Sequence, residues 1–120
     1  MAKAAEPTDE QPITRAVLLV AQLPAVKQAD RVEVREIRMR PGHSADLNVP
    51  IGPVLGVILA GSVNYQVDGE TASVLRAGDA FFEPEGERIA RFAAGDDGAR
   101  FVAYFMLSPG QDPLVAWPRG

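Results

Sequence analysis

The residues that could carry acid–base or metal chemistry are few in this sequence and lie far apart. The chain has one histidine, His43, and no cysteine. Without cysteine, disulfides and thiolate metal sites are excluded. One imidazole cannot hold a transition metal by itself. Because His43 follows Pro41 and Gly42, we interpret it as an exposed turn residue and not as a displaced metal ligand.

Two carboxylates and two tyrosines are the other candidates. Glu83 and Glu85 flank Pro84, a spacing that would suit paired carboxylates in acid–base catalysis. No neighbouring residue would orient a catalytic base, so we interpret both as solvated charges of a turn. Tyr65 and Tyr104 lie among apolar residues, where core packing with a hydrogen-bonded hydroxyl is their usual role. We keep both tyrosines as candidate polar groups of a pocket.

Composition points to one soluble domain with a substantial core. The chain has 120 residues, of which 47% are hydrophobic, and a net charge of −4. Lysine and arginine do not cluster, which argues against a nucleic-acid partner. The longest apolar runs, 16–21 and 54–60, are far shorter than the ~20 residues of a membrane span. Residues 1–12 lack the apolar segment of a signal peptide, so we expect a cytoplasmic protein.

The pattern of turn residues predicts short strands and no helix. Eleven glycines and ten prolines interrupt the chain, with turn signals every 8–12 residues. Asp68-Gly69 between alternating segments predicts a hairpin. The continuous apolar run 54–60 suits a strand buried on both faces. Seven to nine strands of this kind favour a sandwich or a barrel. The expected strands cover residues 13–20, 32–39, 54–60, 62–67, 71–75, 80–83, 88–93 and 100–107.

Two segments carry a more specific pattern. Residues 42–61 read GHSADLNVPIGPVLGVILAG, and residues 78–93 read GDAFFEPEGERIARFA. They resemble the paired signatures of the cupin family, G-(x)5-H-x-H-(x)3–4-E-(x)6-G and G-(x)5-P-x-G-(x)2-H-(x)3-N, with each glycine and proline in place. The resemblance covers roughly residues 32–107. It implies an all-β cupin jelly-roll barrel (a double-stranded β-helix) as a single domain, 13–108, between a flexible tail, 1–12, and a C-terminal tail, 109–120.

The four positions that bind metal in the family are substituted in this chain. They hold Asn48, Pro50, Val54 and Ile89. A divalent ion needs imidazole nitrogens or carboxylate oxygens converging within ~2.0–2.2 Å. Val54 and Ile89 have no lone pair, Pro50 has at most its carbonyl, and Asn48 is a weak ligand alone. We therefore expect no metal and no other cofactor, and we expect these four residues to line a ligand pocket.

Arg91 is a further candidate in the same segment. Because side chains alternate along a strand, Arg91 would share the inner face with Ile89. There it could hold a carboxylate or phosphate of a ligand. Alternatively, a bulge or a position at the barrel mouth could place Arg91 in solvent, or pair it with Glu83 or Glu87.

These observations leave several functions open. The first is a metal-free cupin that binds a small apolar or weakly acidic molecule, or a barrel that is filled by its own side chains and serves only dimerisation. The second is a metal-independent isomerase or epimerase, against which the position of His43 counts. A metal-dependent dioxygenase-type cupin is the third. The strand expected at 13–20 is too apolar to stay exposed, so we expect a homodimer in which it pairs with an edge of the partner subunit.

Overall fold

The computed structural model describes residues 3–45, 50 and 52–113, which form five antiparallel strands. The sheet has the order β1-β5-β2-β3, and β4 also pairs with β2. The described ranges contain no helix, and so none that is long and apolar enough to cross a membrane. The all-β prediction is confirmed. The strands are β1 (Arg31–Met39), β2 (Val54–Val67), β3 (Ser73–Arg76), β4 (Ala80–Glu83) and β5 (Ile89–Leu107).

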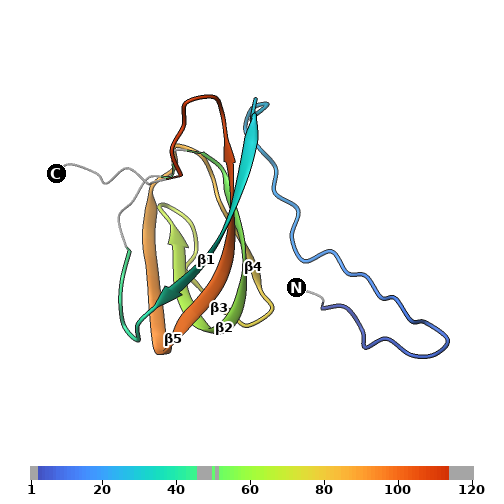
Figure 1. The fold of residues 1–120 in the computed structure, drawn as a ribbon. Coiled ribbons are helices and arrows are strands. Elements are labelled where there is room, and N and C mark those ends of the chain that lie inside the picture. Colours follow the sequence, from blue (N-terminus) through green and yellow to red (C-terminus); the bar gives the residue numbers. More distant parts are fainter. Residues whose placement is uncertain (1–2, 46–49, 51, 114–120) are drawn as a thin grey trace.

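The sheet curls on itself (Figure 1). Its inner face holds a core rich in aromatic rings. β4 and β5 pair with opposite edges of β2, yet the rings of Phe81 and Phe101 lie only 5.7 Å apart. Gly56 of β2 makes this approach possible, because a Cβ there would lie 2.2 Å from the Phe81 ring. Phe92 and Tyr65 complete a cluster of four rings with centroid distances of 5.4–6.1 Å. This cluster fills the centre of the barrel.

Two long strands replace four of the expected short ones. β2 runs through Gly61, and β5 runs through residues 95–98, where we predicted a turn. Gly61 and Gly98 both have φ of +74°, which suits a bulge, and the β2–β5 register shifts between Gly61 and Val63. The two glycines lie at the closest approach of the strands, since a Cβ on Gly61 would lie 2.0 Å from the Gly98 carbonyl oxygen. The predicted count of seven to nine strands is therefore wrong for the described residues.

The expectation that residues 54–60 are buried on both faces is also wrong. Val54, Gly56 and Ile58 are buried, whereas Leu55 and Val57 are half-buried and Leu59 is 40% exposed. One face of β2 points into the barrel, and the other is only partly covered. Across that outer face, Val34 of β1 and Leu55 of β2 both neighbour Tyr104 of β5.

The strand predicted at 13–20 is not formed. We call residues 13–26 the arm. They run extended beside the barrel, and no backbone hydrogen bond joins them to the described part of the chain (Figure 1). Val17 and Val20 are 72% and 79% exposed. A strand needs the N–H and C=O groups of a neighbouring edge, and within one copy of this chain the arm has none.

Candidate functional site

A cavity of about 320 Å³ opens into the barrel beside β1. We call it the Glu83 cavity. Most of its walls are apolar, and they come from β1, β2, β5 and the segment that follows β1. The exceptions are Glu83 at the end of β4, and His43 and Arg38 at the edge. The lining residues are Ile37, Arg38, Met39, His43, Ala45, Val54, Glu83, Phe92, Phe101, Ala103 and Phe105.

Glu83 points into the barrel because β4 is a regular strand. Its four residues, Ala-Phe-Phe-Glu, alternate between faces, so Glu83 shares the inner face with Phe81. It lies opposite Val54 on β2 and is only 9% exposed. Our interpretation of Glu83 as a solvated turn charge is wrong. The signal that could have revealed its burial is the i, i+2 spacing from Phe81, which the adjacent Pro84-Glu85-Gly86 turn obscured.

The carboxyl group of Glu83 makes no hydrogen bond or ion pair with any described residue. No buried side-chain oxygen in the described part lacks a partner. The Glu83 oxygens must therefore keep some accessible surface, and the cavity is the space that Glu83 lines. Burial raises the pKa of Glu83 to about 7, because an apolar environment disfavours the charged form.

Cations near the cavity are engaged elsewhere. Arg38 lines the cavity, but its guanidinium is paired with Glu36 and its side chain is 74% exposed. Neither Arg38 nor Arg35 forms an ion pair with Glu83. The ion pairs are Arg38 with Glu36 at 3.0 Å and Arg35 with Glu33 at 3.0 Å.

The four residues that we expected to line a ligand pocket have different surroundings. Val54 lines the Glu83 cavity, whereas Pro50 and Ile89 are fully buried. The Pro50 carbonyl already accepts a hydrogen bond from the Gly86 N–H at 3.0 Å. Asn48 lies outside the described residues. Within the described ranges, no three histidine, aspartate or glutamate side chains gather closely enough to hold a metal ion. Of the described positions, Val54 and Ile89 have side chains without a donor atom for a metal ion.

Arg91 does not share the inner face with Ile89, contrary to the simple alternation we used. It is exposed, while Ile89 and Phe92 are both buried. The β2–β5 register shifts between Gln66 and Val67, opposite Arg91 and Ile89, and this bulge turns Arg91 outward. The alternative, that a bulge places Arg91 in solvent, describes the structure. It lines neither the Glu83 cavity nor the cavity beside Tyr65.

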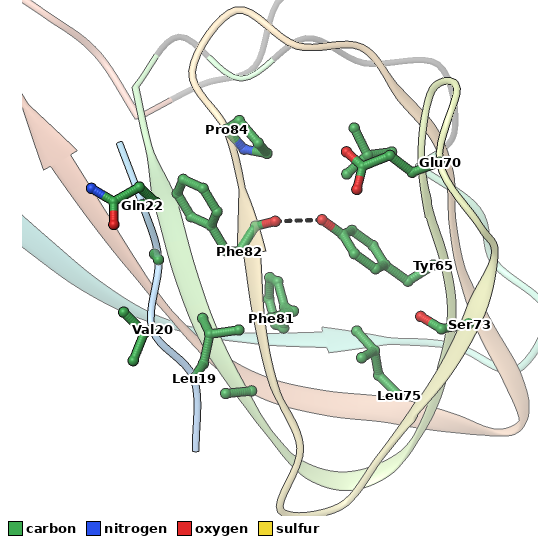
Figure 2. A pocket seen from close by; sticks show the side chains of 13 residues that line it. Leu19, Val20, Gln22, Tyr65, Glu70, Ser73, Leu75, Phe81, Phe82 and Pro84 are labelled. Carbon is green, nitrogen blue, oxygen red and sulfur yellow. Dashed lines mark hydrogen bonds between the residues drawn. The ribbon is translucent and has the colours of Figure 1, made fainter. Parts of the chain in front are cut away.

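The two tyrosines differ. Tyr104 is 39% exposed between buried neighbours, so it lies on the outer face of β5 and not in a pocket. Tyr65 lines a second cavity of about 420 Å³, and its hydroxyl donates to the Phe82 carbonyl (Figure 2). Burial, and then the charges of Glu83 and Glu70, raise the pKa of Tyr65. As Figure 2 shows, the arm at Leu19–Gln22 forms one side of this second cavity.

His43 is exposed, as expected, but it also lies at the edge of the Glu83 cavity. Its backbone is well fixed, because its N–H donates to the Arg40 carbonyl and its carbonyl accepts from the Ala94 N–H. Local sequence does not predict this position, because it depends on the pairing of the segment after β1 with β5.

Comparison with solved structures identifies the fold. The structure superposes on oxalate oxidase in complex with the substrate analogue glycolate, with a TM-score of 0.60 and 21% identity over 72% of this chain and 45% of that one. It superposes on the DMSP lyase DddQ from Ruegeria pomeroyi with a TM-score of 0.65 and 20% identity over 77% of this chain and 46% of that one. The chain has a cupin fold.

A third similar structure is the EutQ protein of Clostridium difficile, with a TM-score of 0.55 and 20% identity over 66% of this chain and 59% of that one. No family model matches the sequence. No curated protein matches it either. The chain spans about half the length of these three structures. At sequence identities near 20%, the similarity shows only that the folds are alike.

Proposed function

We propose that this cupin barrel binds a small molecule in the Glu83 cavity without using a metal ion. The observation that carries the proposal is the cavity itself. Ile58, Ile89 and the four rings fill the barrel centre, yet about 320 Å³ remains open beside Val54. This volume lies at the small end of the ~300–1,000 Å³ range of ligand pockets, and such pockets are mostly apolar with few polar groups. A purely structural barrel would not need this space.

The metal-free part of the proposal rests on the donor set. At the family's metal positions, Val54 and Ile89 offer no donor atom, and the Pro50 carbonyl is already hydrogen-bonded. Elemental analysis of the purified, dialysed protein tests this part. We expect less than stoichiometric iron, manganese, zinc and nickel. A transition metal bound one to one after dialysis would overturn it.

Filling the cavity should abolish binding. Ala103 is 1% exposed and lines the cavity opposite Gly56, so Ala103→Leu places three extra carbons in the ligand space. With benzyl alcohol as a neutral probe, we expect an NMR titration to show at least a tenfold weaker affinity for this variant. The overpacking should lower the free energy of unfolding by about 1–3 kcal/mol. The titration requires that the variant still folds.

The control for this titration is Ala90→Leu, a change of the same size on β5 at a half-buried position outside the cavity walls. It should bind benzyl alcohol as the wild type does. If Ala103→Leu is folded, as its amide spectrum would show, and still binds normally, the ligand does not occupy this cavity.

A metal-independent acid–base enzyme is the second candidate, and Glu83 is the observation that favours it. A carboxyl with a pKa of about 7 can both donate and accept a proton near neutral pH. His43 lies at the edge of the same cavity and would be the partner group. The hydroxyl of Tyr65 donates to the Phe82 carbonyl and lines the other cavity, so it supports this reading less.

The proposed assembly is a homodimer formed through the arm. Val17 and Val20 leave apolar surface in water, and so do Val32 and Val34, which are 55% and 60% exposed on the outer face of β1. If the arm of each copy pairs with the free edge of β1 in the other, the unpaired arm backbone gains partners and apolar surface of both copies is covered. We expect sedimentation equilibrium to give a dimer for the wild type and a monomer for Val17→Glu/Val20→Glu.

The matched control adds two charges at Gln28 and Ala29, which are exposed residues between the arm and β1. Gln28→Glu/Ala29→Glu should remain dimeric. A wild type that sediments as a monomer at concentrations of tens of micromolar would contradict the assembly.

A further inference from the structure

The Glu83 cavity combines one buried acid with a mostly apolar wall, and no described residue pairs with that acid. Glu83 is 9% exposed and has no hydrogen-bond or ion-pair partner among the described residues. The remaining wall includes Ile37, Met39 and the rings of Phe92, Phe101 and Phe105. An unpaired carboxylate in such surroundings is costly, so the missing partner is the feature that needs an explanation.

We propose that the cavity binds a small organic ammonium ion, a compact apolar body with one protonated amine that pairs with Glu83. This inference rests on the proposed function, since it names the ligand of the same cavity. A primary ammonium has three N–H donors, and a carboxylate accepts at both of its oxygens. A hydrogen bond between two charged groups is about twice as strong as one between neutral groups. The ligand therefore supplies both the charge and the donors that the protein omits.

The apolar part of the wall suits the body of the same ligand. Val54 and Met39 can pack against aliphatic or aromatic carbon, and burial of that surface is favourable by roughly 25 cal/mol per Å². Phenylalanine rings also attract cations when the ring face is presented to them. The cavity offers one carboxylate, several rings and little volume. These features favour a cation with a small apolar body over an inorganic ion, because an inorganic ion would need several oxygen or nitrogen donors.

An anionic ligand lacks the corresponding support. Arg91, the residue we expected to hold a carboxylate or phosphate, is exposed outside the cavity. The guanidinium of Arg38 pairs with Glu36, and that of Arg35 pairs with Glu33 while lying 6.0 Å from the Phe105 ring centroid. A carboxylate ligand would meet Glu83 without a cation between them. The weakly acidic ligand considered from the sequence is thus less suited to this cavity than a basic one.

The preference for an amine should depend on pH. Glu83 is the group that must ionise, and a primary alkylamine stays protonated well above pH 8. Among the described residues, the titratable and charged groups around Glu83 are Arg35 and Arg38 from β1, His43 from the following turn and Tyr65 from β2, while the cavity-lining residues of β5 contribute none. The amine should therefore bind more weakly at pH 5, where Glu83 is neutral, than at pH 8.

Three probes of nearly equal shape test the inference: benzylamine, benzyl alcohol and benzoate. Calorimetric or NMR titration of the full chain at pH 8 should show that benzylamine binds about tenfold more tightly than benzyl alcohol. Benzoate should bind more weakly than both. Glu83→Gln should remove the preference, so that benzylamine and benzyl alcohol bind this variant with similar affinity. Glu87→Gln removes a charge from an exposed position of the adjoining turn and should keep the tenfold preference.

The outcomes separate the inference from the proposed function. If benzyl alcohol binds at least as tightly as benzylamine, or if the preference survives in Glu83→Gln, the ammonium site is wrong while the binding cavity stands. If none of the three probes binds the wild type, the proposed function fails and the inference fails with it. Should Glu83→Gln not fold, the wild type decides, because the preference must fall at least threefold from pH 8 to pH 5.

Discussion

Wild-type protein should lose stability between pH 5 and pH 8, and Glu83→Gln should not. The pKa of Glu83 is raised to about 7 in the folded state from an ordinary value of 4.5. Between these values the folded protein holds a proton that the unfolded chain releases. Unfolding is therefore increasingly favoured as the pH rises, and the loss is complete above about pH 7. The difference corresponds to roughly 3 kcal/mol.

Urea denaturation of both proteins at pH 5 and pH 8 measures this effect. The quantity that matters is the change of the free energy of unfolding with pH, because the new amide group shifts the variant at both pH values alike. Glu87→Gln, at an exposed position, should follow the wild type. If the free energy of unfolding changes with pH equally in the wild type and in Glu83→Gln, the Glu83 carboxyl is solvated. The cavity would then contain no buried acid.

Gly61→Ala should be the most damaging single-methyl substitution that we can name. Gly61 has φ of +74°, and a Cβ there would lie 2.0 Å from the Gly98 carbonyl oxygen. Backbone atoms of two central strands cannot move apart cheaply, so we expect a loss of more than about 3 kcal/mol of stability. Thermal and urea unfolding measure it.

Gly69→Ala provides the matched control. Gly69 has φ of +83°, similar to that of Gly61, but a Cβ there would meet nothing within 4 Å. It should cost only the conformational penalty, about 1 kcal/mol. Similar losses for the two variants would mean that β2 and β5 do not approach each other as closely as the structure has them.

Turn chemistry was the most predictable part of the fold. Asp68-Gly69 forms the hairpin between β2 and β3, where the Glu70 N–H donates to the Val67 carbonyl. The turn before β4 likewise has Gly78 at φ of +91°. These features depend on two to four neighbouring residues, so local sequence is sufficient to predict them.

Glycines with positive φ inside strands were harder to interpret. Gly61 and Gly98 were taken as strand ends, because a glycine that needs this conformation most often marks a turn. Whether it instead makes a bulge depends on the strand across from it, and that strand lies more than thirty residues away in the sequence. The arm shows the same limit, since its apolar pattern fits a strand but no edge within one copy pairs with it.

The candidate site was predictable only in outline. The signature spacing located the segments that contribute Val54 and Ile89, and the substituted residues argued against metal. The burial of Glu83 could not be predicted from these residues. It depends on the pairing of the short strand β4 with β2 and on the curl of the whole sheet. Arg91 was misplaced by one bulge, which reverses the face of every residue that follows it until the next irregularity.

The most direct test of metal-independent binding in the Glu83 cavity is a crystal structure of the protein after treatment with a chelator and soaking with benzyl alcohol. Our account predicts the probe inside the barrel, between Glu83 and the rings of Phe101 and Phe105, with Val54 against it. A barrel whose side chains have closed over this space, or a probe that enters only after a transition metal is restored, would contradict it.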